Sequence, residues 1–139
     1  MGIFEKLKDI FAKSSLESIQ DLEKEIKLLH GRAMFSDIVA IIGIGGRLKG
    51  LPLIYSAKQE VEFKILVARI SELINPIKSL EIQNELLEIN LAYRGLYITY
   101  VSIKENIGFL GVSPMMDEII IFRDWIKKNS KILSTLFST

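Results

Sequence analysis

The residues that most suggest chemistry are the glycines and cations between positions 43 and 50. They are Gly43, Gly45, Gly46, Arg47, Lys49 and Gly50. Glycines let backbone N–H groups approach an anion, and two cations would add to the attraction, so a phosphate site is one interpretation. The spacing matches neither nucleotide motif, because Leu48 stands where a dinucleotide fingerprint needs a third glycine and Gly50-Leu51-Pro52 lacks the Lys and Ser or Thr of a P-loop. Turn chemistry alone accounts for these glycines, so we expect a flexible hairpin with a basic tip.

Other residues that could do chemistry are few. His30 is the only histidine and cysteine is absent, so the common zinc and thiol sites are excluded. We expect His30 to have a capping or surface role beside Gly31. Glu60 and Glu62 would point about 200° apart on a helix, and we expect both to be solvated. The sequence therefore predicts no catalytic residue, no metal site and no cofactor, and a protein that is not an enzyme.

Composition limits the possible partners. The chain has 139 residues, 49% of them hydrophobic and 25% charged, which suggests one domain with a proper core. The formal net charge of +1 gives no electrostatic case for nucleic acid. The absence of cysteine is compatible with a reducing cytoplasm, and the longest apolar run, from Ile38 to Gly46, is about half the length of a membrane-spanning helix. We expect a cytoplasmic protein that recognises partners by shape and apolar contact, with peripheral membrane association as an open alternative.

The first thirteen residues have the pattern of an amphipathic helix. Charged side chains cover one side, and the apolar side carries Ile3, Phe4, Leu7, Ile10 and Phe11. These apolar residues could enter a membrane interface while lysines meet anionic head groups, although Glu5 and Asp9 reduce that attraction. Packing of the segment on its own domain or on a partner is the other interpretation.

The next segments predict a helix and two strands. Ser14 and Glu17 form a capping-box pattern, and helical spacing of apolar residues continues to a stop at Gly31. The β-branched run from Asp37 to Ile42 predicts a strand covered on both faces. Leu53 to Ser56 returns as a second strand, with Pro52 at its beginning or at a sheet edge.

A long helix is predicted between Gln59 and Ile77, ending or kinking at Asn75-Pro76. Its broad apolar face comprises Phe63, Leu66, Val67, Ile70, Leu73, Ile74 and Ile77. A narrower stripe of Val61, Ile65 and Ala68 lies nearly opposite, where a helix on a single sheet should be polar. Either a second subunit covers this stripe, or a loop or terminal helix of the same chain does.

The last part of the chain predicts a meander and a final helix. Leu87 to Tyr93 alternates apolar and polar residues, as a strand with one wet face does, and two further strands follow at Leu96–Ile103 and Ile107–Val112. We expect Tyr93, Tyr97 and Tyr100 to fill a sheet surface. Ser113 is predicted to cap the last helix, with Pro114 at its first position.

This order of elements resembles the roadblock/dynein light chain family. The residues that carry the resemblance are Asp37 to Ile42, Gly50-Leu51-Pro52-Leu53 at the entry to the second strand, and Gly95-Leu96-Tyr97-Ile98 at a later turn. The resemblance implies an α+β fold of order αββαβββα, with a five-stranded antiparallel sheet and helices on both faces. Residues 15–139 would form this domain, and residues 1–14 would add an amphipathic helical extension. The basic segment Gly45 to Gly50 departs from the family's short acidic turn.

The same resemblance implies a function. Family members commonly dimerise through the third strand and the middle helix, so the predicted homodimer interface contains Val61, Ile65, Ala68, Leu87, Ile89 and Leu91. The leading hypothesis is a dimeric scaffold or regulator that binds a small Ras-like GTPase. The alternative is a small-ligand sensor or a membrane-attached adaptor with a pocket between sheet and helix.

Overall fold

The computed structural model describes residues 16–80 and 83–137. Their elements, in chain order, are α2 (Leu16–Arg32), β1 (Ile38–Gly43), the 3-10 turn η1 (Gly46–Leu48), β2 (Pro52–Ala57), α3 (Glu60–Lys78), β3 (Glu88–Tyr93), β4 (Leu96–Lys104), β5 (Ile107–Ser113) and α4 (Met116–Leu136). The predicted order αββαβββα is confirmed. The helix predicted for the first thirteen residues, the extension 1–14 and the cap at Ser14 lie outside the described residues.

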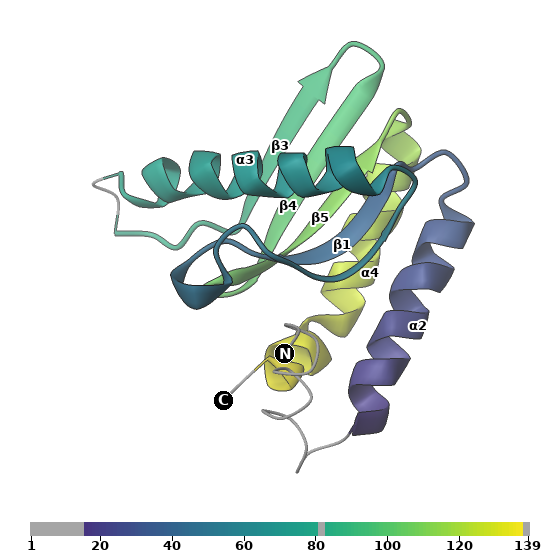
Figure 1. Ribbon diagram of the computed structural model, residues 1–139, viewed down its shortest axis with the longest axis horizontal. Coiled ribbons are helices and arrows are strands. Elements are labelled where there is room, and N and C mark those ends of the chain that lie inside the picture. The colour runs from purple at the N-terminus through teal and green to yellow at the C-terminus, as the bar shows by residue number, and fades with distance from the viewer. Residues whose placement is uncertain (1–15, 81–82, 138–139) are drawn as a thin grey trace.

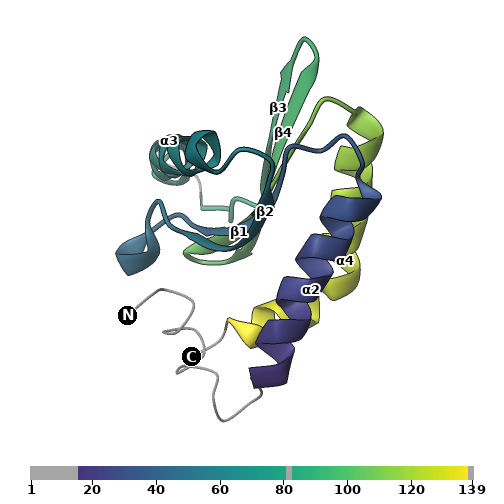
Figure 2. The ribbon, with the colours of Figure 1, turned by 45° about the vertical axis from the view of Figure 1, so that its right-hand side comes forward.

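The strands form one antiparallel sheet in the order β2-β1-β5-β4-β3. Helix α3 covers one face alone, while α2 and α4 lie side by side on the other face (Figures 1 and 2). The α+β class with helices on both faces is therefore confirmed. Pro52 begins β2, an edge strand, as its missing N–H requires.

Alternation along the strands builds a core on each side of the sheet. All six residues of β1 are buried, since β1 lies between β2 and β5 and is covered on both faces. Val39 and Ile41 belong to the cluster under α2 and α4, whereas Ala40 and Ile42 belong to the cluster under α3. This explains why β1 is a continuous apolar run, with no polar alternation.

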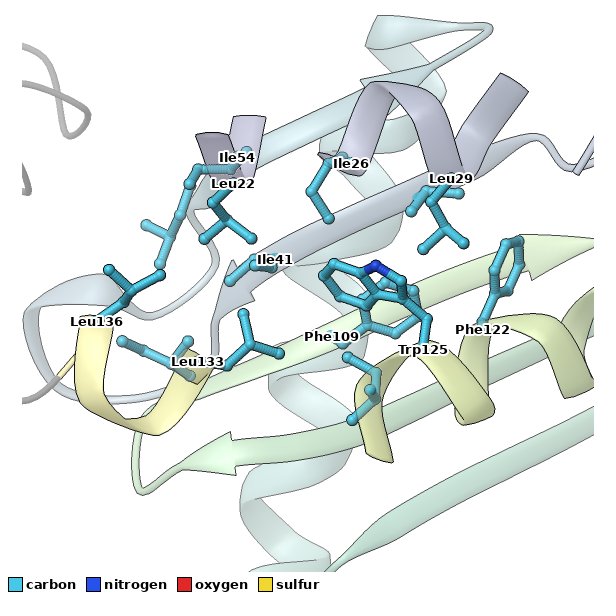
Figure 3. Close-up of a cluster of buried hydrophobic side chains, with 14 of the residues drawn as sticks. Leu22, Ile26, Leu29, Ile41, Ile54, Phe109, Phe122, Trp125, Leu133 and Leu136 are labelled. Carbon is cyan, nitrogen blue, oxygen red and sulfur yellow. The ribbon is translucent and has the colours of Figure 1, made fainter. Parts of the chain in front are cut away.

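Aliphatic side chains make up most of the cluster under α2 and α4, and three aromatic rings pack together within it (Figure 3). Trp125 lies between α2 and the sheet, with its ring centroid 6.0 Å from that of Phe109, and Phe122 lies 5.8 Å from the same ring. Full burial of an aromatic or aliphatic side chain contributes roughly 1.5–3 kcal/mol. Residues of α2, α4 and the strands therefore all contribute to the packing of the two helices on the sheet.

Two predicted helix boundaries are wrong, at Gly31 and Ser113, and the helix predicted to end or kink at Asn75-Pro76 continues to Lys78. Gly31 lies inside α2, which ends at Arg32. Pro76 lies inside α3, two residues before the helix ends. The helix tolerates it there, because the N–H that proline lacks removes a single backbone hydrogen bond near the C-terminus of α3. Ser113 ends β5, and α4 begins at Met116 with Met115 as its N-cap, so Ser113 is no helix cap. Its hydroxyl instead accepts the Met115 N–H at 3.0 Å and donates to the Glu118 carboxylate.

Candidate functional site

The glycine-rich segment forms a closed turn between β1 and β2. Gly46 and Gly50 have φ angles of 59° and 76°, which favour glycine. The N–H groups of Leu48, Lys49, Gly50 and Leu51 all donate to carbonyls within the same turn. These donors are therefore committed to the hairpin and do not form a phosphate cradle, which agrees with the prediction of a hairpin.

His30 joins three segments and is half-buried. Its Nε2 lies 3.0 Å from the Ser36 carbonyl and its Nδ1 lies 2.5 Å from the Ser56 hydroxyl. With Nε2 protonated, the ring donates to the carbonyl and accepts from the hydroxyl. The predicted capping or surface role is wrong, because the ring fastens the end of α2 to β2 and to the loop before β1.

Tyr55 and Tyr100 show how differently the tyrosines are placed. The Tyr55 hydroxyl donates to Glu60, and this hydrogen bond, aided by partial burial and the carboxylate charge, raises the pKa of Tyr55. Glu60 is therefore exposed but not merely solvated. Tyr100 is buried under α3, where burial raises the pKa of its phenol, and its hydroxyl is the buried side-chain group without a partner in the described chain.

Among the described residues, β4 is the one strand that pairs with β3, so the outer edge of β3 is open in this part of the chain. The Ser102 N–H donates to the Leu87 carbonyl at 2.8 Å, and residues of an antiparallel pair alternate between facing the partner strand and facing away. The odd-numbered residues of β3 therefore bond to β4. The backbone N–H and C=O groups of Glu88, Asn90 and Ala92 point to the open edge.

An apolar row borders this edge on the α3 side. Ile89 and Leu91 are half-buried and pack on the cluster under α3, and Leu87 is 66% exposed. Leu66 packs on the same cluster, and Leu73 lies seven residues later on the same flank of α3, where it is exposed. Leu66, Ile89 and Leu91 thus pack on one apolar cluster, and together with exposed Leu73 and Leu87 we call them the edge surface.

Polar contacts fix the other side of β3. The Arg123 guanidinium on α4 donates to Glu88 at 2.9 Å, and the Thr99 hydroxyl donates to the Asn90 side chain at 2.7 Å. Because both acceptors lie on β3, these bonds hold the edge strand against α4 and β4. The strand is thus positioned firmly although one of its edges has no neighbour.

The outer stripe, Val61, Ile65 and Ala68, occupies a different place. All three residues are exposed, Ile65 by 53%, and they lie opposite the buried side of α3. Ala68 also lies beside the β1–β2 turn, since a Cβ at Gly50 would be 3.8 Å from its Cα. The structure therefore places the β3 row together but does not bring the outer stripe to it. The sequence missed the flank residues Leu66 and Leu73 as part of this surface, because their spacing also fits a helix face turned to its own sheet.

Solved structures share this arrangement of sheet and helices. A roadblock/LC7 domain from Streptomyces avermitilis aligns with a TM-score of 0.61 at 9% identity, over 78% of this chain and 93% of that one. The gliding protein MglB from Thermus thermophilus aligns with a TM-score of 0.63 at 9% identity, over 98% of this chain and 91% of that one. MglB from Myxococcus xanthus gives 0.61 at 14% identity, over 79% and 89%.

The chain has the roadblock/LC7 fold. The resemblance that began at Gly50-Leu51-Pro52-Leu53 is confirmed at the level of fold. No protein-family model and no curated protein matches the sequence. The roadblock fold is therefore shared here in architecture, with few of the residues that the solved roadblock structures carry.

Two kinds of site are absent from the part of the chain that the structure describes. Residues 16–80 and 83–137 contain no group of three or more acidic or histidine side chains that could hold a metal ion. Within the same ranges, no helix is both long and apolar enough to cross a membrane.

Proposed function

We propose that the chain is a non-enzymatic scaffold or regulator that forms a homodimer through β3 and binds a small Ras-like GTPase. The observation that carries the dimer is the open edge of β3, which combines unpaired backbone groups with the exposed apolar edge surface. Natural sheets cover or charge such edges, because exposed ones recruit other strands. Pairing with the same strand of a second copy satisfies both needs with one symmetric contact.

Support for self-association also comes from a related fold. An MglB with a TM-score of 0.59 and 9% identity to this chain has been solved in a tetrameric arrangement. Assembly is therefore compatible with this architecture. The GTPase partner rests on the resemblance to the roadblock family, whose members include GTPase regulators.

The outer stripe needs a separate account. In a dimer made by joining two sheets at β3, the two α3 helices lie on the same face, and the flanks that carry Leu66 and Leu73 approach each other. The outer stripe faces away from the joined sheet, so edge pairing alone leaves it exposed. The outer stripe can belong to the dimer interface, as predicted, only if the two α3 helices cross. If they do not cross, the stripe stays uncovered and offers an apolar surface to the GTPase.

The alternative of a ligand sensor or pocket-bearing adaptor predicts polar groups that converge between the sheet and α3. A hollow of about 290 Å³ does lie there, at the start of α3. Its apolar walls include Phe63, Leu66 and Leu96, and its polar walls are Asp37, Lys58, Gln59 and Glu62. The Ser71 hydroxyl, also buried, is already bonded to a carbonyl of α3. The polar residues at this hollow keep the sensor as the alternative, and the scaffold is preferred on the open edge of β3 and its apolar row.

The decisive experiment is a binding assay with small GTPases encoded by the same genome, loaded with GTP or with GDP. We expect one of them to bind in a nucleotide-dependent manner. Ile65→Asp tests the outer stripe, and Ile120→Asp is its matched control, because Ile120 is 49% exposed on α4 across the sheet. Light scattering on the same proteins reports the dimer. If no GTPase binds the wild-type protein in either state, the proposed partner class is wrong, and a wild type that stays monomeric at high concentration contradicts the dimer.

A further inference from the structure

The hollow between the start of α3 and the sheet has a buried apolar floor. This floor contains Ile38 on β1, Val112 on the paired strand β5 and Phe63 on α3, which are 6%, 4% and 0% exposed. Leu66 and Leu96, both half-buried, line the hollow as well. Its volume of about 290 Å³ is close to the lower end of the roughly 300–1,000 Å³ of small-molecule sites, so the hollow suits a small ligand with an apolar part.

Acidic side chains line one part of the rim. Asp37 is half-buried, and no hydrogen bond or ion pair joins its carboxylate to another described residue. The Gln59 amide, with its nitrogen turned toward Glu62, donates at 3.2 Å to both carboxylate oxygens and holds this group at the rim. Because a half-buried carboxylate without a donor is costly, the rim favours a ligand that carries N–H donors.

A cation completes the rim. Lys58 lines the hollow beside Asp37, and its backbone N–H donates to the Asp37 carbonyl at 3.0 Å. The Lys58 ammonium forms no ion pair within residues 16–80 and 83–137. The rim of one small hollow therefore presents charges of both signs, two carboxylates and one ammonium.

A ligand with a single charge fits this rim poorly. An anion would meet Asp37 and Glu62, a cation would meet Lys58, and like charges repel. A small molecule that carries both charges next to an apolar group matches the rim and the floor together. We propose that the hollow binds a free α-amino acid with an apolar side chain, whose ammonium faces the two carboxylates and whose carboxylate faces Lys58. This ligand goes beyond the scaffold function, and its site depends on neither the β3 dimer nor a GTPase.

The rim and the floor contribute separately to binding. The charged groups of the rim are open to water, which screens them, so we expect a dissociation constant on the order of 1 mM. The floor selects the side chain, because burial of each CH₂ group adds to the affinity. Glycine, which offers the same two charges without an apolar side chain, should therefore bind at least about tenfold more weakly.

The test is isothermal titration calorimetry of the full chain with L-leucine and L-phenylalanine. We expect at least one of them to bind. N-acetyl-L-leucine lacks the ammonium and L-leucinamide lacks the carboxylate, so each should bind at least about tenfold more weakly than L-leucine.

Variants at exposed positions assign the site. Lys58→Gln and Glu62→Gln each remove one charge of the rim, and we expect each to weaken binding of the amino acid by about fivefold or more. Lys64→Gln is the matched control, because Lys64 is exposed on the same helix and does not line the hollow. Its affinity should equal that of the wild type.

Each other result overturns the proposal. If neither amino acid binds the wild type, the ligand class is wrong, and the scaffold still stands because its light-scattering and GTPase assays contain no amino acid. N-acetyl-L-leucine or L-leucinamide bound as tightly as L-leucine assigns the hollow to one end of a peptide. Unchanged affinity in Lys58→Gln and Glu62→Gln places the amino acid elsewhere, and an equal loss in Lys64→Gln means that overall charge governs the binding.

Discussion

A single cysteine at Asn90 should link two copies of the chain through a disulfide. The chain contains no cysteine, so Asn90→Cys introduces the only thiol. The substitution removes the acceptor of the Thr99 hydroxyl, at a cost of about 1 kcal/mol, which a folded domain tolerates. Asn90 is chosen because its backbone groups face the open edge of β3, at the middle of the strand.

The structure also determines the expected register. Placing the two-fold axis at Asn90 pairs residues 88, 90 and 92 with residues 92, 90 and 88 of the second copy and uses every outward backbone group of β3. Moving the axis by one residue leaves one of these residues without a partner inside the strand. In the expected register the two Cα atoms of residue 90 are about 5.5 Å apart, within the range of a disulfide. The Cα atoms of residue 92 are separated by four residues along the strand, or about 14 Å, which no disulfide spans.

Ala92→Cys is therefore the matched control, on the same edge and the same side of the strand. After mild oxidation, a non-reducing gel should show Asn90→Cys as a covalent dimer of twice the 15.8 kDa chain mass and Ala92→Cys as monomer. Linkage of Ala92→Cys alone refutes the register. Failure of both variants to link, while the wild type scatters light as a monomer, refutes pairing through β3.

Further predictions concern the interior. Tyr100→Phe should raise the free energy of unfolding by about 1–2 kcal/mol at pH 7, because it removes a buried hydroxyl without a partner, whereas exposed Tyr93→Phe should change it little. Burial raises the pKa of Tyr100, so the phenol ionises more readily in the unfolded chain than in the folded one. The free energy of unfolding of the wild type should therefore stay constant relative to Tyr100→Phe below pH 10 and fall by about 1.4 kcal/mol per pH unit above it, as urea titrations at pH 7–11 would show. Equal pH dependence of the free energy of unfolding in the two proteins contradicts this. Gly108→Ala should destabilise the fold by about 1–3 kcal/mol, measured by the same titration, because its Cβ would overlap the Tyr100 ring, and an unchanged midpoint contradicts that packing. Glu118→Ala should cost about 3 kcal/mol in thermal unfolding, with Glu118→Gln milder, because its carboxylate accepts the Phe35 N–H at 2.9 Å and the Ser113 hydroxyl; equal losses contradict a role for the charge.

Local patterns predicted the elements of this fold well. The buried run of β1 and the alternation in β3 both follow from how many faces of a strand are covered, so residue type and period suffice to identify them. Boundaries were less predictable. Ser113 has the residue type of a cap, but its hydroxyl is drawn to Glu118 by the packing of α4 against the loop that carries Phe35.

Contacts between distant segments could not be predicted in the same way. His30 meets Ser56 across 26 residues, and Arg123 meets Glu88 across 35 residues. No sequence period relates such positions, because tertiary folding alone brings them together. The Asn90–Thr99 bond, nine residues apart, follows from the hairpin register once that register is known.

The candidate interface shows the limit of periodicity most clearly. Helical spacing placed Val61, Ile65 and Ala68 on one stripe, and strand spacing placed Leu87, Ile89 and Leu91 on one row. Neither period says how a helix is rotated over its sheet. Ala68 lies beside the β1–β2 turn, whereas Leu66 packs on the cluster that Ile89 and Leu91 also contact, so the stripe and the row lie on different sides of α3. One apolar surface inferred from sequence thus becomes two, and a dimer through β3 leaves the outer stripe of each copy exposed on the same face of a joined sheet. A variant at residue 65 that keeps the dimer but loses the GTPase would assign these two surfaces to different partners.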